Sequence, residues 1–186
     1  MEGAFGEFAY LPDSDNSIVT ENWVRYTANH RAAIYFSDSS SCQITKNTIE
    51  TLSKGAFVGA NCNSFIISNN TVVDMTGSRT GHGIMFYSSG GVSTYNVMDG
   101  NTITGWRYGI TANRGSQDST ITNNVFSNCT VGTLVTGSFQ MYGNVYNGAS
   151  DSPGNDTTVY FIGFLTLLAV AIVALVLMAR RKKKRV

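Results

Sequence analysis

The chain has 186 residues, of which 42% are hydrophobic, and this leaves room for one domain and little else. The formal net charge of +1 hides a division, because six of the 13 basic residues lie at positions 180–185. The rest of the chain carries 7 basic against 12 acidic side chains, without a basic stripe to neutralise phosphates, which excludes nucleic acid as a partner.

The first 20 residues lack the basic segment, the long apolar segment and the cleavage site of a secretory signal peptide. Residues 4–11 instead look like a β-strand and turn cut off from an earlier repeat, and no polar cap covers them. We therefore expect the chain to be the C-terminal part of a longer surface protein. The alternative is a tail-anchored protein that is inserted without a signal.

Six repeats follow, each with an apolar residue, an asparagine three positions later and another apolar residue two positions beyond. The asparagines are spaced 20 to 31 residues apart and are Asn22, Asn47, Asn70, Asn101, Asn124 and Asn144. A period of this length with one small unit per repeat is typical of a solenoid. Between most of these asparagines a glycine precedes a second apolar run, as in residues 55–58 and 83–86. Each repeat therefore reads as short strands separated by tight turns.

The asparagines also predict how the repeats stack. Asparagine tolerates left-handed backbone at a sharp corner, and its amide both donates and accepts hydrogen bonds. If all six lie at the same corner, each side chain can bond to the next rung as an asparagine ladder, while inward Ile, Val and Phe stack into one core. The sequence therefore predicts an all-β domain over residues 1–149, a single-stranded parallel β-helix of about six rungs.

Over residues 17–147 this pattern resembles the right-handed parallel β-helix family, whose fold is shared by pectate lyases, polygalacturonases and periplasmic copper-site maturation proteins. The resemblance implies a right-handed solenoid. It implies little about chemistry, since a fold of this kind hosts many unrelated functions. A role as a maturation factor for a metal enzyme rests on this fold analogy alone.

The aligned rungs show no pair of carboxylates suited to hydrolysis. Glycoside hydrolysis needs two carboxyl groups at a defined separation, but Glu50 aligns with Arg25 and Val73, and no two acids coincide in adjacent rungs. Residues 81–83 match the Gly-His-Gly element of polygalacturonases, yet apolar residues replace the acids of that family in earlier rungs. We therefore expect His82 to be a turn residue, and we predict no catalytic residue, no metal site and no cofactor.

Two surface features are candidates for ligand binding. One Asn-to-Gly connection is 13 residues long where three others have 8, and this loop holds Asp74, Arg79 and His82. Trp106 and Tyr108 lie in a turn, where exposed aromatic rings can stack on sugars. The alternatives are an insertion absorbed at the surface for the loop and a packing role for the two aromatic residues.

The three cysteines, Cys42, Cys62 and Cys129, have no metal-ligand spacing and occupy different positions in their rungs. A disulfide is thus not suggested, and we expect buried free thiols. Glycosylation sequons begin at three asparagines, consistent with an exposed location, and these are Asn69, Asn128 and Asn155.

The C-terminal segment differs in kind from the repeats. Residues 150–158 are polar and typical of a stalk, whereas residues 159–179 are uncharged and apolar, long enough to span a bilayer as one α-helix. Basic residues dominate the tail 180–186, so the positive-inside rule places the C-terminus in the cytoplasm and the β-helix outside the cell membrane. The alternatives are a buried soluble helix for the apolar segment and a processed sorting signal for the tail.

Together these features predict a single-pass membrane protein that displays a β-helix at the cell surface. Its expected role is structural or adhesive, with glycans or neighbouring proteins as partners. The alternative is a surface polysaccharide lyase or glycoside hydrolase whose catalytic residues lie mostly upstream of this chain.

Overall fold

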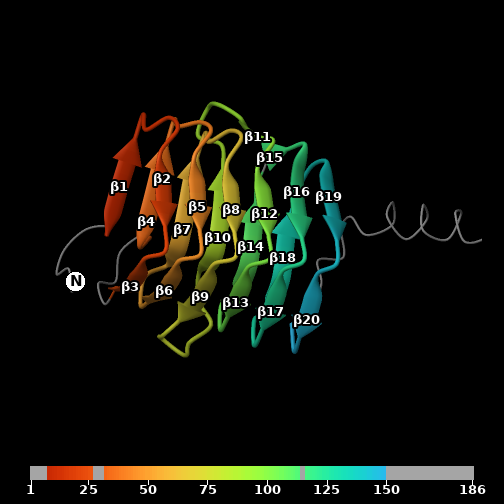
Figure 1. Cartoon of the computed structure of the whole chain (residues 1–186). Coiled ribbons are helices and arrows are strands. Elements are labelled where there is room, and N and C mark those ends of the chain that lie inside the picture. The colour runs from red at the N-terminus through yellow and green to blue at the C-terminus, as the bar shows by residue number, and fades with distance from the viewer. Residues whose placement is uncertain (1–7, 27–31, 114–115, 150–186) are drawn as a thin grey trace, which may run out of the picture. The chain divides into compact units, whose positions relative to one another are not determined.

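The computed structural model describes residues 8–26, 32–113 and 116–149. The chain divides into two compact units after Gly154, and every described residue belongs to the first unit. In that unit three parallel β-sheets of six strands each form the sides of a solenoid (Figure 1). A two-stranded sheet accompanies them, formed by β11 (Ser93–Thr94) and β15 (Ser116–Gln117).

Each turn of the solenoid contributes one strand to each of the three sheets. Sheet 1 contains β1 (Ala9–Pro12), β4 (Ile34–Ser37), β7 (Gly55–Ala60), β10 (His82–Tyr87), β14 (Tyr108–Ala112) and β18 (Val131–Val135). Sheet 2 contains β2 (Ile18–Thr20), β5 (Gln43–Thr45), β8 (Ile66–Ser68), β12 (Val97–Asp99), β16 (Ser119–Thr122) and β19 (Phe139–Tyr142). Sheet 3 contains β3 (Trp23–Tyr26), β6 (Thr48–Thr51), β9 (Thr71–Asp74), β13 (Thr102–Thr104), β17 (Val125–Ser127) and β20 (Val145–Asn147).

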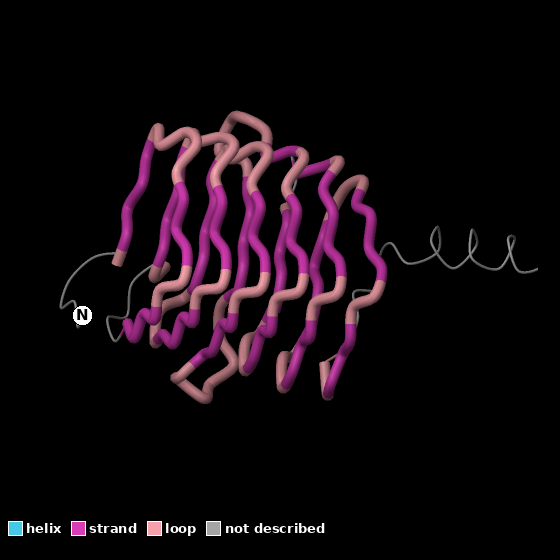
Figure 2. The backbone as a smooth tube through the Cα atoms, in the orientation of Figure 1, coloured by secondary structure: helices cyan, strands magenta, loops and turns pink. Residues whose placement is uncertain are grey.

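The prediction of an all-β solenoid with about six rungs is confirmed. The first rung consists of β1 to β3 and the sixth of β18 to β20, and the part of the chain that the structure describes contains strands and loops but no helix (Figure 2). The strand expected within residues 4–11 is found as β1, which pairs with β4 and so belongs to the first of the six rungs.

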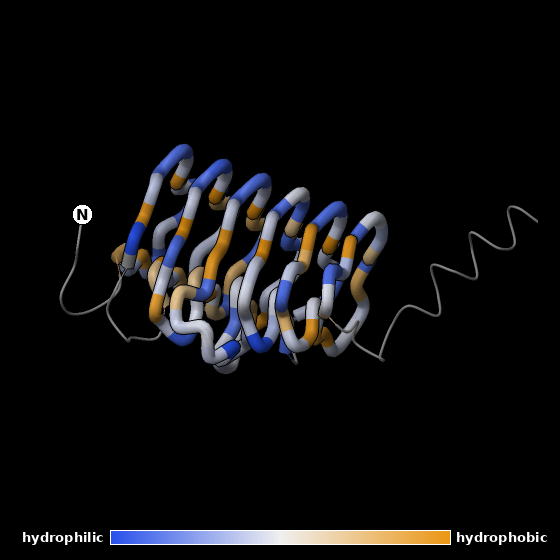
Figure 3. The backbone as a smooth tube through the Cα atoms, turned by 90° about the horizontal axis from the view of Figure 1, so that it is seen from below, coloured by the Kyte–Doolittle hydropathy of each residue, from blue (hydrophilic) through white to orange (hydrophobic). Residues whose placement is uncertain are grey.

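Corresponding positions of successive rungs lie directly above one another. In sheet 3 the register joins one inward position of every rung, occupied by Val24, Ile49, Val72, Ile103, Phe126 and Tyr146. Figure 3 shows hydrophobic positions recurring at corresponding places in successive turns. This stacking makes the core continuous along the solenoid axis, as the repeat period requires.

Aromatic rings fill the middle of this core. Phe36, Phe57, Phe65 and Phe86 are all buried, with ring centroids 5.1 to 6.3 Å apart. Burial of one such side chain stabilises the fold by about 1.5–3 kcal/mol. A Cβ at Gly59 would lie only 2.7 Å from the Phe86 ring, so the glycine makes room for the ring.

The six asparagines form a continuous ladder at the corner between sheets 2 and 3. Each side-chain Nδ2 donates to Oδ1 of the asparagine in the next rung, at 2.9–3.1 Å. From the second rung on, Nδ2 also donates to a backbone carbonyl of the preceding rung, as Asn70 does to Ile44 at 2.9 Å. The Oδ1 atoms accept the backbone N–H of the preceding asparagine as well. Buried amides are therefore satisfied by hydrogen bonds between rungs, which fixes the register.

The predicted stalk (150–158), membrane helix (159–179) and basic tail (180–186) lie outside the described residues. Within the described ranges, no helix has the length and apolar character needed to cross a membrane.

Candidate ligand-binding groove on sheet 1

The outer face of sheet 1 carries a second apolar cluster that is separate from the core. In β4 and β10 the side chains alternate, so that Ile34, Phe36, Ile84 and Phe86 point into the core. The residues between and after them point outward and pack together across β4, β7 and β10, and they are Tyr35, Val58, Ala60, Met85 and Tyr87. The strand period therefore places an apolar, aromatic surface on the outside of the solenoid.

Two tyrosines from distant parts of the sequence meet on this surface. The hydroxyl groups of Tyr35 and Tyr87 lie 2.7 Å apart, although 52 residues separate them. The Tyr10 ring, which is 59% exposed, packs on Tyr35 with centroids 5.5 Å apart. Three aromatic rings thus follow one another across rungs 1, 2 and 4.

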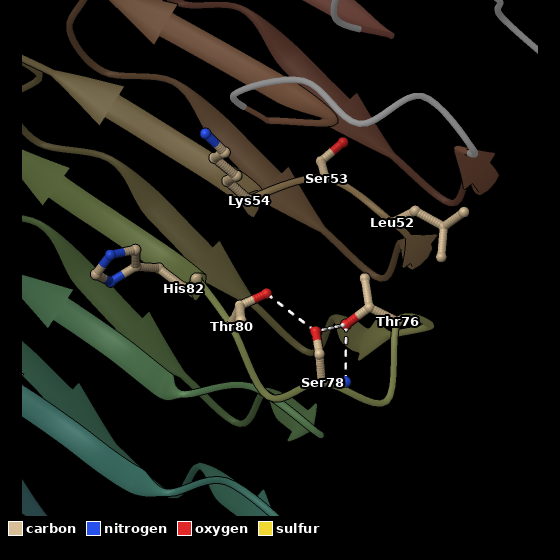
Figure 4. Close-up of a pocket in the computed structure, with 8 residues that line it drawn as sticks. Leu52, Ser53, Lys54, Thr76, Ser78, Thr80 and His82 are labelled. Atoms are coloured by element: carbon tan, nitrogen blue, oxygen red, sulfur yellow. Dashed lines mark hydrogen bonds between the residues drawn. The ribbon is translucent and has the colours of Figure 1, made fainter.

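A groove runs beside these rings, and we call it the sheet 1 groove. It is lined by Tyr35, Lys54, Val58, His82, Met85 and Tyr87. An adjoining hydroxyl pocket shares Lys54 and His82 with the groove (Figure 4). Its other lining residues come from the turns before β7 and β10, and they are Leu52, Ser53, Thr76, Ser78, Thr80 and Gly81.

A chain of hydroxyl groups forms one wall of the hydroxyl pocket and starts at a buried carboxylate. Asp74 is 7% exposed and accepts hydrogen bonds from the Thr76 backbone N–H at 2.7 Å and from Thr76 Oγ1 at 2.9 Å. The hydroxyls of Thr76 and Ser78 lie 2.6 Å apart, and those of Ser78 and Thr80 lie 3.2 Å apart. Asp74 is therefore an anchor of the loop and does not face the solvent.

His82 lies where the groove and the pocket meet. Its ring stacks on Tyr108, with centroids 5.1 Å apart, and its Nδ1 lies 2.7 Å from Thr111 Oγ1. Burial lowers the pKa of His82, and the positive charge of Arg107 lowers it further. The imidazole is therefore neutral at neutral pH, and it offers hydrogen bonds and a flat face but no charge.

The extended loop does not gather its three predicted site residues around one ligand position. Asp74 bonds to Thr76, and His82 bonds to Thr111. Arg79 lies in the loop after β9 and donates to the side chain of Asn128, which follows β17, two rungs further along sheet 3. The structure instead brings His82 onto Tyr108, a pairing that was not predicted.

The expectation of an exposed Trp106 is wrong. Its side chain is 0% exposed and belongs to the main core, so it is not available to stack on a sugar. Gly83 packs tightly in the same region, because a Cβ there would lie 2.7 Å from the Gly109 carbonyl oxygen and from Ile103 Cγ2. Tyr108 next to it is half-buried between His82 and the guanidinium of Arg107, whose Cζ lies 5.1 Å from the Tyr108 ring centroid. Of the two aromatic candidates only Tyr108 reaches the surface.

The predicted sequons and thiols have different surroundings. Asn69 and Asn128 are both exposed, and Asn155 lies outside the described residues. All three thiols are free and buried, as expected. Burial raises the pKa of the Cys62 thiol to about 12, so this thiol stays protonated.

The groove offers no pair of acids for hydrolysis. Its lining contains no carboxylate, and along the described strands no two carboxylates are register partners in adjacent rungs. Glu50 pairs in register with Arg25, and the two form an ion pair at 3.4 Å.

A family model described as periplasmic copper-binding protein (NosD) matches residues 3–159 of the chain. No curated protein matches the chain. Copper favours thiolate, thioether and imidazole ligands, but within the described ranges no three His, Cys, Asp or Glu side chains are grouped to hold a metal. His82 and Met85 are the soft donors that line the groove, and two donors do not complete a copper site.

Proposed function

The chain belongs to the NosD periplasmic copper-binding protein family, and from that premise we propose that its β-helix is an outward-facing binding module that holds glycans along the sheet 1 groove. The observation that carries this proposal is the run of rings formed by Tyr10, Tyr35 and Tyr87. A tyrosine ring offers a flat apolar face and a hydroxyl group at its edge. A sugar ring matches both, with C–H groups on its faces and hydroxyl groups around its rim.

The geometry of the solenoid favours an extended ligand. Parallel strands lie about 4.8 Å apart, so rungs 1 to 4 offer a platform roughly 14 Å long. Repeated structures use such continuous faces as extended binding surfaces. A polymer that runs along the solenoid axis would contact Tyr10 and Tyr87, while Tyr35, which is 8% exposed, packs against both of them.

The proposed site of action is the outer surface of a membrane. The uncharged residues 159–179, followed directly by six basic residues, support anchorage by one helix with the C-terminus in the cytoplasm. A periplasmic family description agrees with a β-helix that faces outward. The module would then serve in adhesion or in cell-surface structure.

Binding of the purified full chain, kept in a mild detergent, to an oligosaccharide array tests this proposal. Tyr10→Ala should weaken binding about 2- to 10-fold, because one aromatic contact contributes about 0.5–1.5 kcal/mol. Tyr142→Ala is the matched control, since Tyr142 is 55% exposed on sheet 2 and should leave binding unchanged. Absence of binding, or an equal loss in both variants, would overturn the proposal. Release of shorter sugars from the array would favour an enzyme instead.

A further inference from the structure

We infer that the ligand of the sheet 1 groove is an acidic glycan, whose carboxylate or sulfate group is held by Lys54 at the junction of the groove and the hydroxyl pocket. This inference rests on the proposed glycan binding and names the class of glycan. Three features support it: the distribution of charged side chains, the position and partners of Lys54, and the direction of the hydrogen bonds between the hydroxyl groups.

Positive charge is concentrated at one corner of the solenoid. Three successive rungs each place one exposed cation in the turn that leads into sheet 1, and these are Lys54 before β7, Arg79 before β10 and Arg107 before β14. They are three of the five basic residues in the described ranges. We call this set the basic corner.

The basic corner holds more positive than negative charge. Of the eight acidic residues in the described ranges, Asp74 alone lies at this corner, and its carboxylate is buried and bonded to Thr76. The two described basic residues elsewhere are both paired, Arg25 with Glu50 at 3.4 Å and Lys46 with Glu21 at 3.1 Å. The described ranges show no ion pair for a cation of the basic corner, so three cations and one carboxylate leave this corner with a net positive charge.

Among the described residues, Lys54 is the cation of this corner that lines both the groove and the hydroxyl pocket. Arg79 donates to Asn128, and Arg107 lies over the Tyr108 ring at 5.1 Å. Lys54 Nζ has no hydrogen-bond partner or ion pair among the described residues, and its side chain lines both the groove and the hydroxyl pocket (Figure 4). The ammonium group of this shared residue carries three hydrogen-bond donors.

The hydroxyl chain would bind a different part of the same ligand. The Thr76 hydroxyl donates its proton to Asp74, so the 2.6 Å contact requires the Ser78 hydroxyl to donate to Thr76. The Ser78 oxygen can then only accept from Thr80 at 3.2 Å. Every hydroxyl proton in the chain thus points toward the Asp74 carboxylate. The Thr76 oxygen also accepts the Ser78 backbone N–H at 3.1 Å, so the lone pairs that remain for a ligand belong to Ser78 and Thr80. Such a wall accepts hydrogen bonds from the hydroxyl groups of a sugar, while the anionic group of that sugar is held by Lys54.

The test compares an oligosaccharide that contains glucuronic acid with its carboxyl-reduced neutral form, and includes a sulfated oligosaccharide as a third probe. The full chain should bind both acidic probes at least tenfold more tightly than the neutral one, because a hydrogen bond to a charged group contributes about 1.5–3 kcal/mol. This preference should weaken at high salt, which screens exposed charges.

Lys54→Gln should weaken binding of the acidic probes far more than binding of the neutral probe, and so remove most of the preference. Lys46→Gln is the matched control, because Lys46 is exposed in the same rung at a different corner, and it should keep the preference. If acidic and neutral probes bind equally, and Tyr10→Ala weakens both, the inference is wrong while the proposed function stands. If no probe binds, both are wrong.

Discussion

Replacing Asn101 by alanine should destabilise the protein more than the same change at Asn22, although both residues belong to one ladder. The Asn101 side chain is fully buried and makes four hydrogen bonds of 2.9–3.0 Å, two as donor and two as acceptor. Its loss leaves the buried backbone N–H of Asn70 without the acceptor that it uses in the native structure. Asn22 is exposed, and its side chain donates two hydrogen bonds, to Asn47 and to the Thr20 carbonyl.

The magnitudes follow from these counts. One typical hydrogen bond contributes about 0.5–1.5 kcal/mol net, and a buried polar group left unpaired costs about 1–3 kcal/mol. Asn101→Ala should therefore lower the free energy of unfolding by about 3–5 kcal/mol. Asn22→Ala should lower it by about 1 kcal/mol, because water can replace the lost bonds at an exposed position.

Urea unfolding of the full chain, followed by circular dichroism of the β-sheet signal, measures both changes. The two variants should differ in the midpoint of the transition and keep the same slope. If Asn101→Ala and Asn22→Ala unfold at the same urea concentration, the ladder is not what stabilises the stacking of the rungs, and the apolar core alone carries it.

Three further predictions concern other parts of the solenoid. Gly59→Ala should lower the free energy of unfolding by about 1–3 kcal/mol, since its Cβ would lie 2.7 Å from the Phe86 ring, and urea unfolding measures the loss. Because burial lowers the pKa of His82 in the folded state, the unfolded state binds more protons below its ordinary pKa near 6.5, so stability should fall as pH drops through that value. His82→Gln should reduce this loss of stability between pH 8 and pH 5. If the variant loses as much stability over this range as the native chain, His82 is not the group responsible. Cys62, whose thiol pKa is raised to about 12, should resist iodoacetamide at pH 8 in the folded chain and react once urea unfolds it, as mass spectrometry can measure.

The architecture could be predicted because each rung repeats the same local pattern. The asparagines and the apolar positions beside them occur at fixed steps within a rung, so six weak signals combine into one strong prediction. The spacing between rungs varies, but this variation is confined to loops such as residues 75–81, and the register of the strands is unaffected.

The binding surface could not be predicted in the same way. Tyr35 and Tyr87 belong to rungs that do not pair directly, and their contact depends on the exact register of the intervening β7. Trp106 occurs in a polar turn sequence that is typical of an exposed residue. It is nevertheless fully buried in the main core, and neither the repeat pattern nor the neighbouring residue types indicate this burial.

The asparagine ladder gives the solenoid a direction. The first five side-chain amides each donate one hydrogen bond to the asparagine of the next rung, so the five bonds between the side chains all point toward the sixth rung and align like dipoles in a row. At the first rung Asn22 Oδ1 accepts no hydrogen bond from the described residues, and it offers that acceptor to any further strand that stacks there. Only a rung of the same orientation presents a donor to it, because an inverted rung would bring acceptor against acceptor. A 23-residue rung such as residues 48–70 can therefore be duplicated to lengthen the solenoid, and any lengthening must proceed with unchanged polarity.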